Sequence, residues 1–317
     1  KVKKVFWCKS CLNMSTRPRI QFDKRGYCNA CVWSENKKTF NWKKRDNELK
    51  KLLKKYKSKN RYFDCIIPVS GGKDGTYVSH ILKSKYGLRP LTVTSRPPLT
   101  LKIGNKNLEN FVRSGFDHIH VTPNEETMRE FNKQGFIDMG FPYYGWLVSI
   151  FSVIINISLK FKIPLIFYGE NGEVEYGGNL NKNTPRVNLA EISKVFLEGG
   201  YKKIYQKLKK KNKSLFWFEL PQAKENDFFI THWSYFEPWD SYRNYLVAKE
   251  KYNLTESDKT NPGTFTNFAQ TDQALYDLHT YIMYLKFGFG RATQDVGIEI
   301  RRGAMTRDQG VNLVKLY

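Results

Sequence analysis

The residue types best suited to bind a phosphate group lie in one short stretch of the chain. An apolar run over residues 63–69 leads into Ser70-Gly71-Gly72-Lys73-Asp74-Gly75-Thr76, and a helical pattern follows. The run predicts a buried parallel strand, and adjacent glycines let the backbone approach a ligand closely. A helix that begins at this turn points its N–H groups and the positive end of its dipole at an anion. The segment therefore predicts a phosphate-binding turn, although it lacks the Walker A spacing Gly-x-x-x-x-Gly-Lys-Ser/Thr.

A second chemical signal is a pair of Cys-x-x-Cys motifs, formed by Cys8, Cys11, Cys28 and Cys31. Four thiolates at this spacing are typical of a closed, tetrahedral zinc site, which is structural far more often than catalytic. Disulfides are the competing interpretation. No apolar signal segment follows the first residues, and Cys65 falls in a predicted core strand, so zinc is the better interpretation.

Carboxylates are concentrated after another strand-like run, 163–168. The loop that follows holds Glu170, Glu173 and Glu175 among several glycines. Acidic loop residues are usually just solvated, but this loop should lie beside the phosphate-binding turn in a chain short of acidic residues. Oxygen ligands suit magnesium, and carboxylates stabilise cationic transition states. We therefore expect a functional role for Glu170 and Glu173.

A fourth candidate segment is Gly288-Phe289-Gly290-Arg291-Ala292-Thr293-Gln294-Asp295. Two glycines followed by an arginine and a carboxylate suit a loop that holds an anion, because the guanidinium presents a planar fork of donors. The alternative is a structural arginine that pairs with Asp295 or Glu299.

Strand-like and helical patterns alternate from residue 63 onward. Strands are predicted at 63–69, 91–95, 118–122 and 163–168, and helices at 76–86, 105–114, 125–139 and 143–161. This alternation predicts an α/β fold, an open parallel sheet with helices on both faces. Ligands in such sheets lie beyond the carboxyl ends of the strands, where the strand order switches. Thr94 and Ser95, at the end of the second strand, are accordingly placed for adenosine.

The pattern divides the chain into three regions. Residues 1–44 form a zinc-binding module with four cysteines, residues 45–178 an ATP-binding α/β domain, and residues 179–317 a mainly helical extension that completes the substrate site. Within the extension, helices are predicted at 189–211 and 273–286, a strand at 228–235, a helix starting near Asp240, and a capping box Thr306-x-x-Gln309 before a final helix.

Composition limits the kind of protein this is. The chain has 317 residues, 40% of them hydrophobic, and a formal charge of +23, which fits either an anionic partner or plain solubility. The uncharged run 139–159 approaches the length of a membrane span, but its glycines, prolines and serines favour a helix buried against a sheet. We therefore expect no membrane span and a cytoplasmic protein. The missing initiator Met and the helical ending at Tyr317 indicate a trimmed chain.

Several of these motifs occur in the order found in one family. The paired cysteines, the turn 70–75, Gly169-Glu170-Asn171 with Glu175-Tyr176-Gly177, Pro238-Trp239-Asp240, and the run 286–293 together resemble the N-acetyl sugar amidotransferases of surface-polysaccharide and flagellar-glycan synthesis. The turn alone resembles the PP-loop of ATP pyrophosphatases. The usual last Ser of that loop is replaced here by Gly75, and Thr76 is the residue that could supply the hydroxyl.

The resemblance implies a reaction and a set of roles. ATP adenylylates the oxygen of an acetamido group on a sugar nucleotide, and ammonia then displaces AMP to give an acetamidine. Ser70, Gly71, Gly72, Lys73, Gly75 and Thr76 would hold ATP. Asp74 would bind Mg²⁺ and act in catalysis with Lys73, Glu170 and Glu173. Asn171, Glu175, Tyr176, Arg291, Thr293 and Asp295 would contact the substrate. The implied partners are a glutaminase and a cyclase-like barrel that deliver ammonia, because no glutaminase signature is found in this chain.

Two other functions remain open at this point. A tRNA-modifying thiolase or ligase with the same loop would suit the positive charge, but no further cysteine pair accompanies Cys65, so a nucleic-acid partner is not favoured. A non-catalytic, zinc-containing interaction protein is the other alternative, and the combination of Ser70, Gly72 and Asp74 argues against it.

Overall fold

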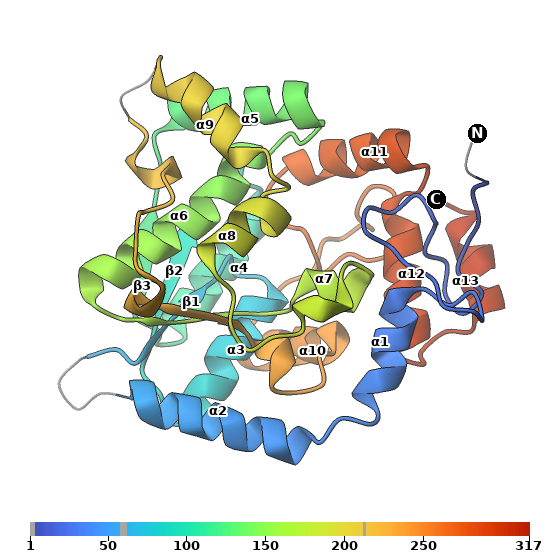
Figure 1. The fold of residues 1–317 in the computed structure, drawn as a ribbon, viewed down its shortest axis with the longest axis horizontal. Coiled ribbons are helices and arrows are strands. Elements are labelled where there is room, and N and C mark those ends of the chain that lie inside the picture. The colour runs from blue at the N-terminus through green and yellow to red at the C-terminus, as the bar shows by residue number, and fades with distance from the viewer. Residues whose placement is uncertain (1–3, 58–61, 212–213) are drawn as a thin grey trace.

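A five-stranded parallel sheet forms the centre of the protein. The computed structural model describes residues 4–57, 62–211 and 214–317 (Figure 1). The strands lie in the order β3-β2-β1-β4-β5. Their bounds are β1 Cys65–Pro68, β2 Pro90–Ser95, β3 His118–Val121, β4 Leu165–Tyr168 and β5 Phe229–His232. The predicted α/β fold with an open parallel sheet is confirmed.

The strand order places a topological switch beside β1. Ile66 pairs with Leu91 of β2 on one side and with Ile166 of β4 on the other. The chain moves outward from β1 through β2 to β3 and then crosses back to place β4 on the opposite side of β1. The loops after β1 and β4 therefore open from adjacent strands, which is where ligands bind in such sheets.

Alternate side chains of the sheet face two separate helical layers. Ile66, Ile166 and Ile230 belong to a core shared with α5, α6 and α9, whereas Ile67 and Phe167 belong to a core shared with α2, α3, α4 and α10. On the first face the helices are α5 Glu125–Met139, α6 Tyr144–Phe161, α8 Leu189–Glu191 and α9 Tyr201–Lys209. On the second they are α2 Trp42–Tyr56, α3 Lys73–Ser84, α4 Lys102–Arg113 and α10 Ser241–Tyr252.

Helix α6 is the segment that raised the question of a membrane span. It is long and apolar enough to cross a membrane by length and composition, but 72% of it is buried inside the protein. It packs against β1 and β2 and against the neighbouring α5. Its apolar character is thus accounted for by the core it fills.

The remaining helices gather at one end of the sheet, at the right of Figure 1. They are α1 Asn29–Lys37, α7 Gly172–Tyr176, α11 Leu275–Phe287, α12 Arg291–Arg301 and α13 Arg307–Val314. The cysteine-containing N-terminal segment packs directly against the C-terminal helices: Thr16 Oγ1 donates to the Phe287 carbonyl over 2.5 Å, and Ser34 Oγ donates to the Arg301 carbonyl over 3.1 Å.

Three local expectations need correction. The helix predicted at 189–211 is broken by a π-helical turn, Ile192–Phe196, and by Gly199, whose φ is 70°. The anion-holding loop predicted up to Asp295 is largely helical, because α12 begins at Arg291. Strand β5 lies beyond the region boundary proposed at 178, so the sheet extends into the C-terminal part of the chain. The capping box of Thr306 and Gln309 is confirmed.

Candidate active site at the switch between β1 and β4

The turn after β1 is held in one conformation by its glycines. Gly71 has a φ of +81°, and a Cβ built there would lie 2.3 Å from the backbone nitrogen of Leu108 in α4. A Cβ at Gly75 would lie 2.7 Å from the Pro68 carbonyl oxygen. Gly72 caps the twelve-residue α3 in an extended conformation, so the first N–H groups of that helix open toward the turn. Only glycine fits this close approach to α4.

Asp74 is fixed in the first turn of α3. Its carboxylate forms an ion pair with the neighbouring Lys73, and Asn244 of α10 donates to its other oxygen over 3.1 Å. Asn244 is completely buried, so its amide is a rigid support. Sequence reasoning missed Asn244, although it lies one helical turn after the Pro238-Trp239-Asp240 motif that had been singled out.

Glu170 lies close to Asp74, at the end of β4. The glycine before it, Gly169, is a close-packed point where a Cβ would lie 3.1 Å from Trp239 and 3.5 Å from the Cβ of Asp74. Tyr176 donates its hydroxyl to Glu170 over 3.1 Å. Desolvation and the negative charge of Asp74 raise the pKa of Glu170 to about 7, while the Lys73 ammonium opposes the rise. A carboxyl with this pKa can exchange a proton near neutral pH, as general acid–base chemistry requires.

A third carboxyl, that of Asp272, comes from the C-terminal part of the chain. Desolvation raises the pKa of Asp272 to about 6, and the Ser70 hydroxyl of the phosphate-binding turn opposes this rise. Its Oδ1 atom is buried without a partner in the described part of the chain, and so are both side-chain amide atoms of Gln273. The segment is anchored by Leu101, which donates its N–H to the Asp272 carbonyl over 3.2 Å. No sequence motif marked Asp272; only the tertiary fold brings it to the turn.

Two of the predicted acidic residues do not join this group. Glu173 accepts hydrogen bonds from Arg19 at distances down to 2.6 Å, and Glu175 pairs with Lys37 at 2.8 Å and accepts from Trp33 Nε1. Both therefore connect α7 to the cysteine module.

Asn171 also has a structural contact, because its side chain accepts from the N–H of Glu173 and caps α7. Of the predicted residues in this loop, the structure brings Glu170 and Tyr176 to Asp74.

The hydroxyls predicted to contact adenosine are used inside the protein. Thr94 Oγ1 donates to the Val69 carbonyl over 2.5 Å, and Ser95 Oγ bonds Ser149 Oγ over 2.8 Å. Thr76 and Thr293 are buried in the first turns of α3 and α12. All four hydroxyl-bearing side chains are therefore buried in this structure.

Arg291 forms an ion pair with Asp295, as expected for the alternative of a structural arginine. Its Nε lies 2.8 Å from Asp295 Oδ1, and the two side chains are 17% and 5% exposed. Asp295 also accepts hydrogen bonds from Thr264 and Thr266, at 2.7 and 3.2 Å. The pair joins α12 to the preceding loop, while the substrate-binding role of Arg291 stays a prediction.

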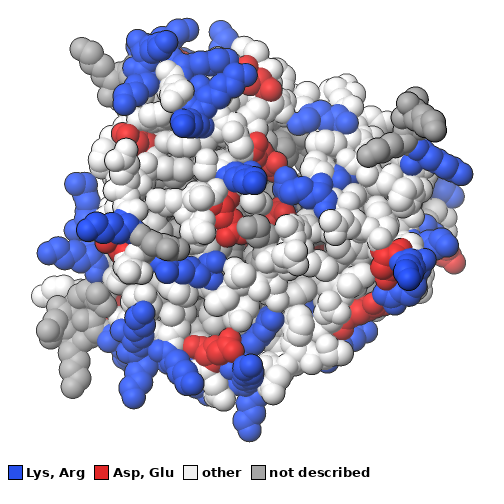
Figure 2. Space-filling view, in the orientation of Figure 1, with Lys and Arg blue, Asp and Glu red and all other residues white. Residues whose placement is uncertain are grey.

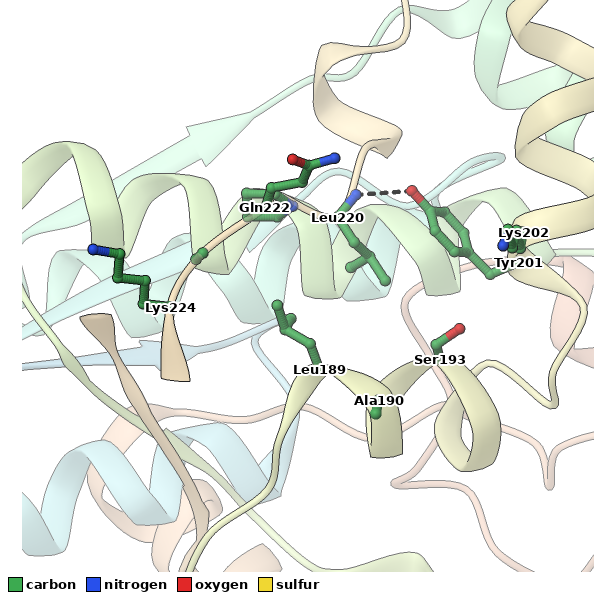
Figure 3. Close-up of a pocket in the computed structure, with 10 residues that line it drawn as sticks. Leu189, Ala190, Ser193, Tyr201, Lys202, Leu220, Gln222 and Lys224 are labelled. Atoms are coloured by element: carbon green, nitrogen blue, oxygen red, sulfur yellow. Dashed lines mark hydrogen bonds between the residues drawn. The ribbon is translucent and has the colours of Figure 1, made fainter. Parts of the chain in front are cut away.

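Two pockets lie in the same region of the protein as the candidate site. One, of about 700 Å³, lies beyond the carboxyl ends of β2 and β3 and is lined by Arg96, Thr122, Arg129 and Leu275 among others. The second, of about 430 Å³, lies between the cysteine module, α7 and α11. A third hollow of about 680 Å³ is lined by α8 and the Leu220–Lys224 segment (Figure 3). None of its lining residues comes from the turn or from α7, so it is not part of this site.

The four cysteine sulfurs of the N-terminal module converge on one point. Their Sγ atoms all lie within 4.8 Å of one another, with neighbouring distances of 3.6 to 3.8 Å. A tetrahedron with metal–sulfur bonds of about 2.3 Å has edges of about 3.8 Å, so the donors fit a single zinc-sized ion. All four residues are buried. The module is a metal-binding site with four cysteine ligands.

Cationic and amide groups surround these sulfurs. Arg301 Nη1 of α12 donates to Cys11 Sγ over 3.6 Å, and Asn13 donates to Cys28 Sγ over 3.4 Å. A metal bound by four thiolates carries net negative charge, which the half-buried guanidinium would offset. The same module contacts the loop just after α7 through Asn29, which donates to the Gly178 carbonyl.

Basic side chains are more frequent than acidic ones on the visible surface (Figure 2). The chain has 53 Lys and Arg against 30 Asp and Glu, and a dense basic group lies over α9 at the upper left of Figure 2. An open groove there is lined by Lys202, Lys203 and Lys207, two of which lie within 3.6 Å of Asp138. This groove shares no lining residue with the turn or the cysteine cluster, so the excess charge is spread beyond the active site.

Comparison with known proteins identifies the C-terminal segment. Residues 262–317 match the family model described as LPS biosynthesis protein WbpG-like, C-terminal domain. This match supports the sugar amidotransferase resemblance, and the matched segment contains Asp272, Arg291 and Arg301.

One solved structure is aligned over most of the chain. It is the U34-tRNA thiolase NcsA from Methanococcus maripaludis with its [4Fe-4S] cluster, at 14% identity and a TM-score of 0.36, covering 98% of this chain and 89% of that one. The comparison with curated proteins finds no match.

Proposed function

Because residues 262–317 match the WbpG-like C-terminal family, we propose that the chain is an ATP-dependent amidotransferase that converts an acetamido group on an activated sugar into an acetamidino group. The observation that carries the proposal is the cluster of Asp74, Glu170 and Tyr176 at the switch between β1 and β4, next to a phosphate-binding turn. ATP and Mg²⁺ are the expected cofactors, and zinc is the expected metal of the four-cysteine module.

In the first step, the amide oxygen attacks the α-phosphorus of ATP. An O–P bond forms and the bond to pyrophosphate breaks, and the resulting cation releases the amide N–H proton to solvent to give an O-adenylyl imidate. The α3 N–H groups and Lys73 stabilise the negative charge that develops on the departing pyrophosphate. Asp74 would hold the magnesium ion, which neutralises phosphate charge when bound.

In the second step, ammonia attacks the imidate carbon and AMP leaves with the former amide oxygen. Ammonia must lose protons as the new C–N bond forms. Glu170 is the group placed to accept one, because its pKa of about 7 lets it exchange a proton near neutral pH. Tyr176 keeps the carboxyl of Glu170 in position by its 3.1 Å hydrogen bond.

The cysteine inventory supports amidine formation over a thiolation that passes sulfur through a free cysteine. Cys8, Cys11, Cys28 and Cys31 form the metal site, and Cys65 is 0% exposed in the core strand β1. Desolvation also raises the pKa of Cys65 above its usual value, which disfavours the thiolate. The chain thus has no accessible thiol to carry sulfur, whereas amidine formation needs none.

The decisive experiment measures pyrophosphate and AMP release from ATP with ammonium chloride and a panel of N-acetylated sugar nucleotides. Mass spectrometry should show a product lighter than the substrate by about one mass unit, because =NH replaces =O. The Asp74→Asn variant should keep its fold and lose AMP formation by at least about 100-fold. Turnover with tRNA but with no sugar would overturn the proposal.

A further inference from the structure

The second pocket described above lies where three distant parts of the chain meet. Arg17 and Arg19 come from the cysteine module, Gly172 from the start of α7, and His279 and Lys286 from α11. Its volume of about 430 Å³ is within the range of small-molecule sites. Neither the sequence motifs nor the matched family description assigns a ligand to it.

The cationic groups in this pocket are not equivalent. Arg19 is engaged by Glu173 and Glu198, at 2.6 and 2.9 Å. Lys286 donates to the Met139 carbonyl over 2.7 Å. Within the described parts of the chain, the Arg17 side chain forms neither an ion pair nor a hydrogen bond. Arg17 is therefore the cation that the fold leaves available.

The surroundings of Arg17 destabilise its positive charge when the pocket holds no anion. Desolvation, with a further contribution from Arg301, lowers the pKa of the Arg17 guanidinium to about 10. A desolvated charge without a partner is costly, and an anion that forms a two-pronged contact with the guanidinium relieves that cost. The pocket thus favours a phosphate or carboxylate group over a neutral ligand.

The other walls of the pocket suit a ring. Phe141, Phe287 and Phe289 line it, and His279 packs against Phe141 with ring centroids 4.7 Å apart. His279 Nδ1 is buried without a partner in the described structure, so it offers a hydrogen bond to a ligand hydroxyl. An anionic group attached to a sugar or nucleoside ring matches this combination.

The pocket also adjoins the catalytic carboxyls. Tyr176 of α7, whose neutral hydroxyl donates to Glu170, lies near the Arg17 guanidinium. Gly172 and Glu173 of α7 form part of the pocket wall. A ligand held by Arg17 would thus extend along α7 toward the reacting groups.

We infer that this pocket binds the anionic group of the sugar substrate, with Arg17 as its main partner. The inference rests on the proposed function for the identity of the substrate. It gives the cysteine module a direct part in substrate binding as well as in structure.

Calorimetry on the zinc-loaded chain tests this inference with two probes, UDP for a phosphate-bearing handle and glucuronic acid for a sugar carboxylate. Arg17→Gln should weaken the better probe by at least about tenfold. Arg25→Gln is the matched control, because Arg25 lies in the same module but pairs with Asp23 and Glu35 on the surface. It should bind like the wild type, and zinc content should be equal in all three proteins.

A second variant separates this pocket from the ATP site. Met283→Trp should fill the pocket and block the probe, while ATP binding stays unchanged. Lys73→Ala should weaken ATP binding and leave probe binding unchanged. The inference is overturned if the probe is lost in Lys73→Ala and retained in Arg17→Gln, or if neither probe binds the wild type. Because ATP turnover is not involved, the result stands whether or not the amidotransferase assay succeeds.

Discussion

At the scale of single residues, Glu170 shows how function and stability conflict. Its pKa is raised from 4.5 to about 7. Between these values the unfolded chain releases a proton that the folded chain keeps, so folding stability falls as pH rises through this range. Glu170→Gln removes that loss. We predict a higher melting temperature than wild type at pH 8 without ATP or magnesium, little difference at pH 4.5, and much slower AMP formation.

The control for this prediction is Glu109→Gln on the surface of α4. Glu109 is 57% exposed and, among the described residues, pairs with Arg113 alone, so its substitution should leave the pH dependence of melting unchanged. If Glu170→Gln melts with the same pH dependence as wild type, the carboxyl of Glu170 is not desolvated and its assignment as the proton acceptor fails.

Arg291 gives a second test at this scale. Arg291→Met leaves Asp295 buried with only two hydroxyl partners, so we expect a loss of about 3 kcal/mol in the free energy of unfolding. Arg302→Met, which removes a more exposed pair with Glu299, should cost about 1 kcal/mol or less. Denaturant titrations measure both. If Arg291→Met has unchanged stability and a raised KM for an anionic substrate, Arg291 binds substrate rather than stabilising the fold.

The sequence predicted the type of chemistry at the site better than it predicted which residues lie there. The turn at Ser70–Asp74 and Glu170 follow strand ends, so a strand prediction is enough to place them. Glu173 and Glu175 lie in the same loop, but each meets a cation from a module more than a hundred residues away. Asp272 and Arg17 were missed for the same reason, because only long-range packing gives them their neighbours.

At the scale of elements, predictions succeeded where local and tertiary signals agree. Helix α5 has its predicted bounds because Asn124 caps its start and Gly140, with a φ of 60°, ends it. The helix predicted at 189–211 failed because its apolar pattern continues through Gly199 and Gly200, where the chain turns. A Cβ at Gly200 would lie 2.3 Å from Met139 Sδ, so packing rather than periodicity decides that break.

The phosphate-binding turn can be tested as an element. Gly71→Ala forces a side chain into a positive φ and against the backbone of α4. Gly115→Ala is the matched control, because Gly115 has a φ of +94° but open space around its Cβ position. Each substitution should cost about 1–2 kcal/mol for the backbone conformation. Gly71→Ala should cost clearly more and should also abolish ATP binding in calorimetry. Equal stability of the two variants would show that contact with α4 does not shape the turn.

At the scale of the whole molecule, the metal site connects both ends of the chain to α7. We predict about one zinc per chain by elemental analysis. Cys28→Ser should lose the metal, lower the melting temperature and reduce AMP formation, because Arg301 and Asn29 would no longer be held. Cys65→Ala changes the one cysteine outside the cluster and should keep the metal. Full zinc retention in Cys28→Ser would show that the four sulfurs do not bind it together.

The source of nitrogen is also a property of the whole molecule. Every cysteine is either in the metal site or in the core, so none is available as the nucleophile of a cysteine-dependent glutaminase. We predict that the isolated chain uses ammonium but not glutamine, and that ammonium serves better at higher pH, where more of it is neutral. Glutamine-dependent turnover by this chain alone would contradict the proposal of a separate ammonia-supplying partner.

The contact between Arg301 and Cys11 spans 290 positions of the chain. During synthesis the cysteine segment leaves the ribosome first, and its guanidinium partner follows roughly 15–60 s later at ordinary elongation rates. Over that interval the sulfurs can already take up a metal, but until α11 is synthesised the pocket beside Arg17 lacks the wall that carries His279 and Lys286. A nascent chain that still lacks α11 and α12 could thus bind a metal before the proposed substrate pocket is complete.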